Sequence, residues 1–162
     1  MECSVVLLVT CRTGSDEWCA REIGDFLFSL DSNVIVEETG FPGVLQVRSC
    51  IDAGRIYGRA LSGEYGFVEN IIPVQRVVPL TGLLRDPLGS LSGLELPERV
   101  KVRVRMRGVR GVSRDVFTSL VKELKERGII HDPASTRCLF IESIGDKVYI
   151  GVGYCEAIRR CF

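Results

Sequence analysis

The sequence has little of the material from which most catalytic and metal sites are built. Its 162 residues include one histidine, His131, and one tryptophan, Trp18. A single histidine excludes any metal site that needs several histidine ligands. The seven cysteines form no CxxC pair, the spacing typical of zinc sites and thioredoxin-like redox sites. We therefore expect neither a metal nor a cofactor.

Long apolar runs are missing as well. No stretch approaches the ~18 apolar residues that a membrane-spanning helix needs. The first ten residues contain an apolar run at positions 5–9, but no basic segment and no small-residue cleavage site, so the pattern of a signal peptide is absent. We expect residues 5–9 to form a buried strand, and the protein to be cytoplasmic with no membrane partner.

Catalytic motifs are also absent. Neither glycine-rich phosphate-binding pattern occurs, and the adjacent Glu37 and Glu38 would point to opposite faces of a strand, so they do not form an acid–base pair. His131 precedes Asp132 and Pro133, a combination typical of a turn. These absences predict that the protein is not an enzyme. One alternative stays open, a small enzyme that uses a cysteine thiolate together with His131.

The cysteines have a simpler explanation than catalysis. Buried cysteine behaves as a small hydrophobic residue, and this is the favoured role for all seven. Intracellular proteins of hyperthermophiles do form disulfides, and the seventeen arginines against four lysines fit such a source. One or two disulfides therefore remain open.

The net charge of zero hides a strong division along the chain. Residues 1–70 hold five basic and eleven acidic side chains, a net charge of −6. Residues 71–162 hold sixteen basic and ten acidic side chains, a net charge of +6. Seven basic residues and no acidic one lie within residues 99–114. This asymmetry predicts two units, one of which binds a polyanion.

Periodicity in the first half predicts a ferredoxin-like pattern. We expect a strand at residues 4–11, a helix capped by Ser15, a hairpin of strands 34–38 and 44–49, a helix that begins at Asp52, and a strand at 68–78. The order strand, helix, strand, strand, helix, strand is that of the split βαβ fold.

The second half has a different order of elements. Residues 79–97 are rich in leucine and predict one or two short linking helices. A strand at 100–107, a helix at 114–127 and two strands at 138–144 and 147–153, joined by a tight turn, follow. We expect an α+β fold in which a ferredoxin-like domain, residues 1–79, packs with a second α/β domain, residues 80–162.

The strand at residues 100–107 is the strongest functional signal. Its odd positions Lys101, Arg103, Arg105 and Arg107 would all point to one side, with cations about 6.7 Å apart. This spacing is near that of phosphates along a nucleic-acid strand. A solvated sheet face is the alternative. Aromatic residues do not alternate with these arginines in the sequence, so the pattern predicts contacts to the nucleic-acid backbone rather than to stacked bases.

This second half resembles the THUMP domain of several tRNA-modifying enzymes, and the first half resembles the domain that precedes it there. The resemblance is closest to stand-alone THUMP adaptors of tRNA cytidine acetylation. It implies that the protein binds tRNA at the acceptor end and presents it to a separate modifying enzyme, without catalysis of its own. The RNA contacts that it implies are Lys101, Arg103, Arg105, Arg107, Arg110, Arg114, Arg137 and Lys147.

The interpretation that follows is a non-catalytic tRNA-binding adaptor. No catalytic domain follows the last expected strand, which supports this interpretation. A protein-binding or regulatory module whose arginine face meets an acidic partner remains an alternative. A homodimer that pairs the acidic half of one copy with the basic half of the other belongs to the same class.

Overall fold

A computed structural model describes residues 3–160 and divides them into two compact units. The first unit comprises residues 3–74 together with 156–160, and the second comprises residues 75–155. This division differs from the expected boundary at residue 79. Residues 76–79 form a strand of the second sheet, and residues 159 and 160 pair with a strand of the first unit.

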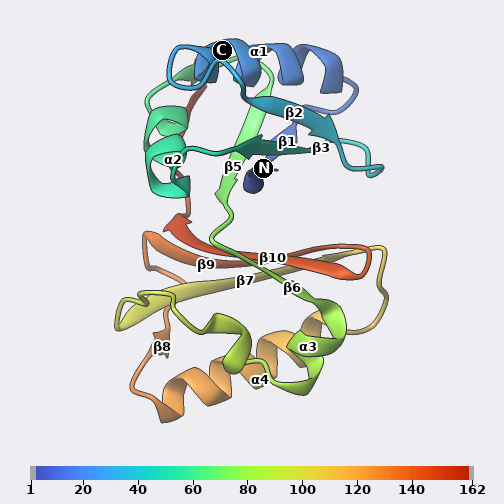
Figure 1. The fold of residues 1–162 in the computed structure, drawn as a ribbon. Coiled ribbons are helices and arrows are strands. Elements are labelled where there is room, and N and C mark those ends of the chain that lie inside the picture. Colours follow the sequence, from blue (N-terminus) through green and yellow to red (C-terminus); the bar gives the residue numbers. More distant parts are fainter. Residues whose placement is uncertain (1–2, 161–162) are drawn as a thin grey trace. The chain divides into compact units, whose positions relative to one another are not determined.

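The first unit has the expected ferredoxin-like topology (Figure 1). Its elements are β1 (Ser4–Cys11), α1 (Asp16–Phe28), β2 (Ile35–Glu38), β3 (Val44–Ser49), α2 (Ala53–Leu61), β4 (Glu64–Tyr65), β5 (Val68–Pro73) and β11 (Arg159–Arg160). The main sheet has the order β2-β3-β1-β5, and all neighbouring strands are antiparallel. Strand β1 is buried from its second residue to its last, as the apolar run at residues 5–9 predicts.

Both helices of the first unit contribute to one core. Helix α1 buries Cys19, Ile23 and Leu27, which follow helical spacing and therefore lie on one face of the helix. The two helices differ at their N-termini. Asp52 caps α2 as expected by accepting a hydrogen bond from the Arg55 amide, whereas the Ser15 side chain makes no capping bond to α1.

The second unit is a five-stranded sheet covered by helices. Its elements are β6 (Arg76–Pro79), α3 (Leu80–Arg85), the short 3-10 helix η1 (Gly89–Leu91), β7 (Arg99–Arg107), α4 (Ser113–Glu126), β8 (Ile130–His131), β9 (Arg137–Ile144) and β10 (Lys147–Tyr154). The strand order is β6-β10-β9-β7-β8. Strands β7 and β9 are parallel and are connected through α4, whereas β9, β10 and β6 are antiparallel neighbours.

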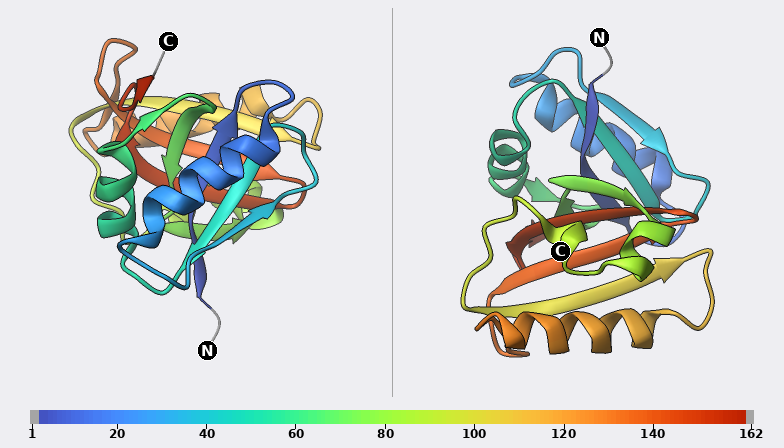
Figure 2. Two further views of the ribbon diagram at one scale, coloured as in Figure 1. Left: turned by 90° about the horizontal axis from the view of Figure 1, so that it is seen from above. Right: turned by 60° about the horizontal axis from the view of Figure 1, so that its bottom comes forward.

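The core of this unit lies between the sheet and α4. Val100 and Val102 of β7 are buried in this core. Helix α4 contributes three buried residues spaced four apart, which therefore lie on one face of the helix: Val116, Leu120 and Leu124. Figure 2 shows α4 lying along one face of the sheet, and the packing of Val100 and Val102 against α4 assigns their side chains to that face. The opposite face of β7 therefore carries the odd-numbered, basic residues, as the alternation predicts.

One expected strand is in fact two. The sequence predicts a single strand at residues 68–78, but β5 ends at Pro73 in the first sheet and β6 begins at Arg76 in the second. Between them the Val74 amide donates to the Val6 carbonyl and the Gln75 amide donates to the Ile150 carbonyl. The change of sheet follows a proline, which has no N–H to continue the ladder.

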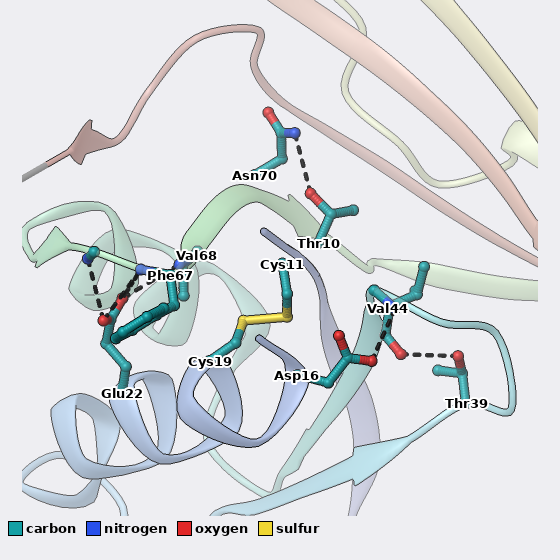
Figure 3. The surroundings of a disulfide bond; sticks show 12 residues. Thr10, Cys11, Asp16, Cys19, Glu22, Thr39, Val44, Phe67, Val68 and Asn70 are labelled. Carbon is teal, nitrogen blue, oxygen red and sulfur yellow. Dashed lines mark hydrogen bonds between the residues drawn. A yellow bond between two sulfur atoms is a disulfide. The ribbon is translucent and has the colours of Figure 1, made fainter. Parts of the chain in front are cut away.

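Three disulfides are present among residues 3–160, more than the one or two left open by the sequence. They join Cys3 to Cys50, Cys11 to Cys19, and Cys138 to Cys155. Figure 3 shows the second of these, which ties the end of β1 to the first turns of α1. No helix within residues 3–160 is long and apolar enough to cross a membrane.

We predict that reduction destabilises the folded protein. Opening the disulfide between Cys138 and Cys155, which closes a loop of 17 residues, removes a constraint on the unfolded chain that is worth about 3 kcal/mol for a loop of this size. Thermal unfolding with and without reductant measures the loss. Alkylation of the denatured protein should label six more cysteines after reduction than before it. Equal labelling before and after reduction would contradict the pairing.

Candidate nucleic-acid interface

Three of the four cations predicted at odd positions 101–107 are exposed or half-buried on the side of the sheet away from α4. Arg103 and Arg105 are exposed and Lys101 is half-buried, whereas the intervening Val102 is buried. A strand presents alternate residues to the same face, so the three side chains form a row. We call Lys101, Arg103 and Arg105 the β7 cation row.

An aromatic ring that the sequence did not associate with this row lies beside it. Strand register places Phe140 of β9 next to Arg103, and the Arg103 guanidinium lies 5.6 Å from the centre of the Phe140 ring. Phe140 is itself buried. It supports Arg103 from the neighbouring strand and offers little ring surface for a base.

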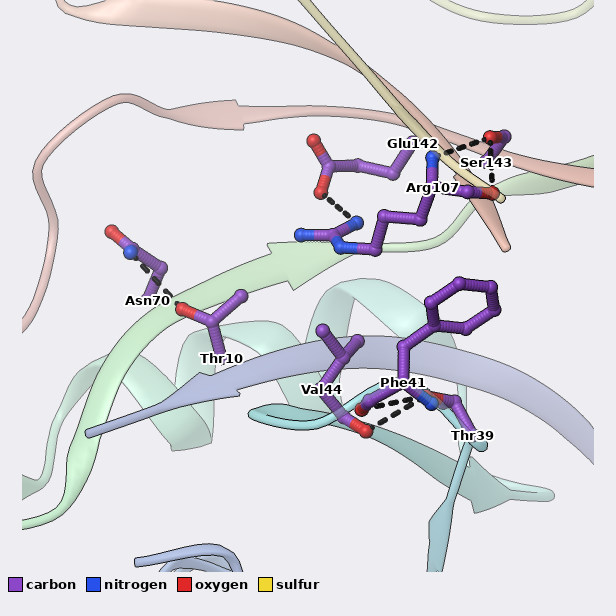
Figure 4. A network of polar contacts seen from close by, with 8 residues as sticks. All are labelled: Thr10, Thr39, Phe41, Val44, Asn70, Arg107, Glu142 and Ser143. Carbon is purple, nitrogen blue, oxygen red and sulfur yellow. Dashed lines mark hydrogen bonds and ion pairs between the residues drawn. The ribbon is translucent and has the colours of Figure 1, made fainter. Parts of the chain in front are cut away.

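Arg107 is not in the position that the sequence predicts. We expected an exposed phosphate contact, but its side chain is only 8% exposed and its Nη1 donates to Glu142 Oε1 at 2.8 Å (Figure 4). Ser143 Oγ accepts a hydrogen bond from the Arg107 amide. The buried Nη2 atom has no hydrogen-bond partner among residues 3–160. The reason for the difference is Glu142, which is distant in sequence but lies on the strand next to β7.

Glu142 also changes the electrostatics of the basic face. Its side chain is 5% exposed, and this burial raises the pKa of the Glu142 carboxyl group, while the nearby Arg107, Arg105 and Arg103 act in the opposite direction. Residues 99–114 contain no acid, but the folded face does contain one, because the parallel register places Glu142 beside Arg105. The sequence does not predict that Glu142 lies on this face, because the residues of one strand do not determine which residues of the neighbouring strand they pair with.

Three further predicted residues lie around the end of β7. Arg110 lies in the loop after β7, Arg114 in the first turn of α4, and Lys147 at the start of β10, and all three are exposed. The Gly145 amide donates to the Arg107 carbonyl, so the turn before Lys147 lies next to the end of β7. The α4 N-terminus has no side-chain cap, which leaves its first amides available for hydrogen bonding to an anion.

Arg137 lies apart from this group. It is the first residue of β9, opposite Tyr154 at the end of β10, and therefore at the other end of the sheet from Lys147. Its guanidinium lies 4.9 Å from the Tyr154 ring centre, and its Nε donates to the Gly153 carbonyl. The structure thus places six of the eight predicted residues on the exposed side of β7 or around its end, buries Arg107, and places Arg137 near the opposite, Lys101 end of the strand.

His131 has a structural position. It belongs to the short strand β8, where its Nδ1 accepts a hydrogen bond from the Val102 amide at 3.0 Å and its ring lies edge-on to Phe117. The expected turn therefore begins one residue later. Every cysteine among residues 3–160 is in a disulfide, so this part of the chain offers no thiolate to act with His131. Residues 3–160 contain no group of three or more His, Cys, Asp or Glu side chains that could hold a metal ion.

The fold is found in several solved structures. TrmN from Thermus thermophilus matches 92% of this chain and 45% of its own, with a TM-score of 0.65 and 19% identity. A predicted N6-adenine-specific DNA methylase from Listeria monocytogenes matches with a TM-score of 0.57 and 14% identity, over 91% of this chain and 40% of its own. PH1313 from Pyrococcus horikoshii matches with a TM-score of 0.56 and 13% identity, over 93% of this chain and 55% of its own.

These likenesses confirm the predicted fold class, an α+β chain with a ferredoxin-like part and a THUMP-like part. No family model and no curated protein matches the sequence. The chain spans about half the length of the solved proteins that it resembles, between 40% and 55%.

The expectation that the protein is not an enzyme is therefore wrong. It depended on the missing catalytic motifs and on the lack of a catalytic domain after the last expected strand, yet the same fold occurs within a longer protein described as a predicted methylase. The lack of a catalytic motif in 162 residues does not exclude activity for a protein that contains this fold.

We predict that Arg107→Ala destabilises the fold instead of merely weakening RNA binding. The substitution leaves Glu142 buried without its partner, at an expected cost of about 3–5 kcal/mol. Urea unfolding measures this loss. The double variant Arg107→Met with Glu142→Leu should recover most of the stability, because no buried charge remains. A single variant as stable as the original chain would contradict the buried ion pair.

Proposed function

We propose that this chain is the tRNA-binding part of a tRNA-modification system and that its second unit carries the contacts. The observation that carries the proposal is the β7 cation row, in which Arg103 and Arg105 are exposed on the face opposite α4. The exposed Arg110, Arg114 and Lys147 extend this basic surface beyond the end of the strand.

The chemistry of the row suits a phosphate backbone. Alternate residues of a strand are about 6.7 Å apart, and the sheet holds their backbone atoms rigidly. The guanidinium group is planar and donates two parallel hydrogen bonds to one phosphate, which favours arginine over lysine here. Such contacts recognise the backbone and shape of the RNA more than its base sequence.

The choice of tRNA has separate support. The sequence resembles THUMP domains of tRNA-modifying enzymes, and the fold is of that type. By this resemblance, we propose that the chain binds the acceptor end and presents the tRNA to a modifying activity. The likeness to stand-alone THUMP adaptors favours cytidine acetylation, whereas the likeness to a predicted methylase favours methylation. Mass spectrometry of tRNA nucleosides from cells lacking the protein distinguishes the two, since a different nucleoside disappears in each case.

We predict that Arg103→Ala with Arg105→Ala weakens tRNA binding about 10- to 100-fold at low salt, because two charge-assisted phosphate contacts are lost. Fluorescence anisotropy with labelled tRNA across a salt series provides the measurement. The slope of log affinity against log salt should become shallower by about 1.4–1.8, as expected for two lost contacts.

A matched control removes two cations from the other side of the sheet. Lys122 and Lys125 are exposed on α4, which packs against the face that the β7 cation row does not use. Lys122→Ala with Lys125→Ala changes the net charge equally and should leave the affinity within about twofold, since only distant charges are altered. Equal effects of the two double variants would mean that net charge alone explains binding. No binding of the unaltered protein at low salt would overturn the proposed function.

A further inference from the structure

The first unit carries an exposed pair of aromatic rings that the proposed interface does not use. Trp18, in the first turn of α1, is 59% exposed. Its ring stacks on that of Phe67, with 6.1 Å between the centres and 23° between the planes. Phe67 is partly buried against the core of the unit, so it anchors the pair. We call Trp18 and Phe67 the aromatic platform.

The backbone beneath this platform is held unusually firmly (Figure 3). Cys19, the residue after Trp18, is joined to Cys11 by a disulfide. The Glu22 carboxylate, one turn along α1, accepts hydrogen bonds from the successive amides of Gly66, Phe67 and Val68. These bonds fix both chain segments that carry the rings. A rigid support under an exposed ring lowers the entropy cost of binding a ligand there.

Two arginines flank the aromatic platform. The Arg21 guanidinium lies 5.5 Å from the centre of the Trp18 ring, and Arg12 Nη1 donates to the Gly66 carbonyl beside Phe67. Both arginine residues are exposed. Two carboxylates of α1 are engaged, since Asp16 accepts a hydrogen bond from the Gly43 amide and Glu22 accepts hydrogen bonds from three successive amides. Glu17 forms only an exposed ion pair with Arg21, at 3.5 Å, and exposed pairs of this kind are weak.

We propose that the aromatic platform binds an unpaired nucleobase of single-stranded RNA, which stacks on Trp18 while Arg12 and Arg21 approach the adjoining phosphates. This inference rests on the proposed function, because it supplies that RNA with a second contact in the other unit. Flat aromatic rings flanked by arginine are the surface on which proteins stack unpaired bases. A basic protein surface is the competing occupant. It is disfavoured because Asp16 and Glu22 are already bonded to backbone amides.

The protein carries its own reporter for this site, since Trp18 is its only tryptophan. We expect short single-stranded oligoadenylate to quench Trp18 fluorescence saturably, and oligouridylate to do so with lower affinity because uracil stacks less strongly. Inorganic polyphosphate carries the charge without the bases and should leave the emission unchanged. Quenching by polyphosphate equal to that by oligoadenylate would overturn the proposal.

Substitutions test the same site through RNA affinity. Trp18→Ala should weaken binding of RNA with a single-stranded overhang about 5- to 100-fold, and Trp18→Phe should restore part of the loss. Binding of blunt duplex RNA should not change. Phe28→Ala is the matched control, since Phe28 is an equally exposed aromatic residue at the other end of α1. Far-ultraviolet circular dichroism of each variant checks that it folds.

The outcomes separate this proposal from the proposed function. If Trp18→Ala binds overhang RNA as well as the unaltered protein while Arg103→Ala with Arg105→Ala binds weakly, the platform proposal fails and the tRNA interface stands. If oligoadenylate quenches Trp18 fluorescence but the protein does not bind tRNA, the proposed tRNA function fails and the aromatic platform still binds single-stranded RNA. If polylysine shifts Trp18 emission and no RNA does, the platform is a protein-binding surface and the proposal fails.

Discussion

The parallel pairing of β7 with β9 is the constraint on which the second unit depends. Parallel neighbours need a crossover connection, and α4 provides it by covering the face that carries Val100 and Val102. The basic side chains of β7 are thereby left on the opposite face. The same register sets Arg103 beside Phe140 and Arg105 beside Glu142. One strand pairing therefore fixes the core, the exposure of the cations and the position of the acid among them.

Much of this could be predicted from the sequence, because strands and helices leave periodic patterns. The alternation in β7, the helical spacing in α4 and the Asp52 cap of α2 are each local, and each is confirmed. The ferredoxin-like order of the first unit followed from the same local patterns. The two-residue strands β4, β8 and β11 were not predicted, since two residues show no period and form only through their partners.

The candidate site was less predictable than the fold, because it depends on contacts between distant residues. Arg107 looks like Arg103 and Arg105 in sequence, and only the neighbouring strand shows that it is paired with Glu142. Trp18 of α1 stacks on Phe67, the residue directly before β5. No sequence pattern in either segment predicts this contact. Disulfides have the same property, since cysteine spacing alone does not give their connectivity.

The acidic character of the first unit does not argue against contact with RNA. Many of its carboxylates serve the fold: Asp52 caps a helix, Asp31 accepts from Ser49 and the Asn33 amide, and Glu37 pairs with Arg48. A carboxylate that accepts hydrogen bonds or faces a cation has part of its field compensated locally, and salt screens the remainder within about 8 Å. The net charge of a unit is therefore a poor guide to its individual surfaces. At the aromatic platform Asp16 and Glu22 are bonded to backbone amides, Glu17 forms an exposed ion pair with Arg21, and the Arg21 guanidinium lies beside the Trp18 ring.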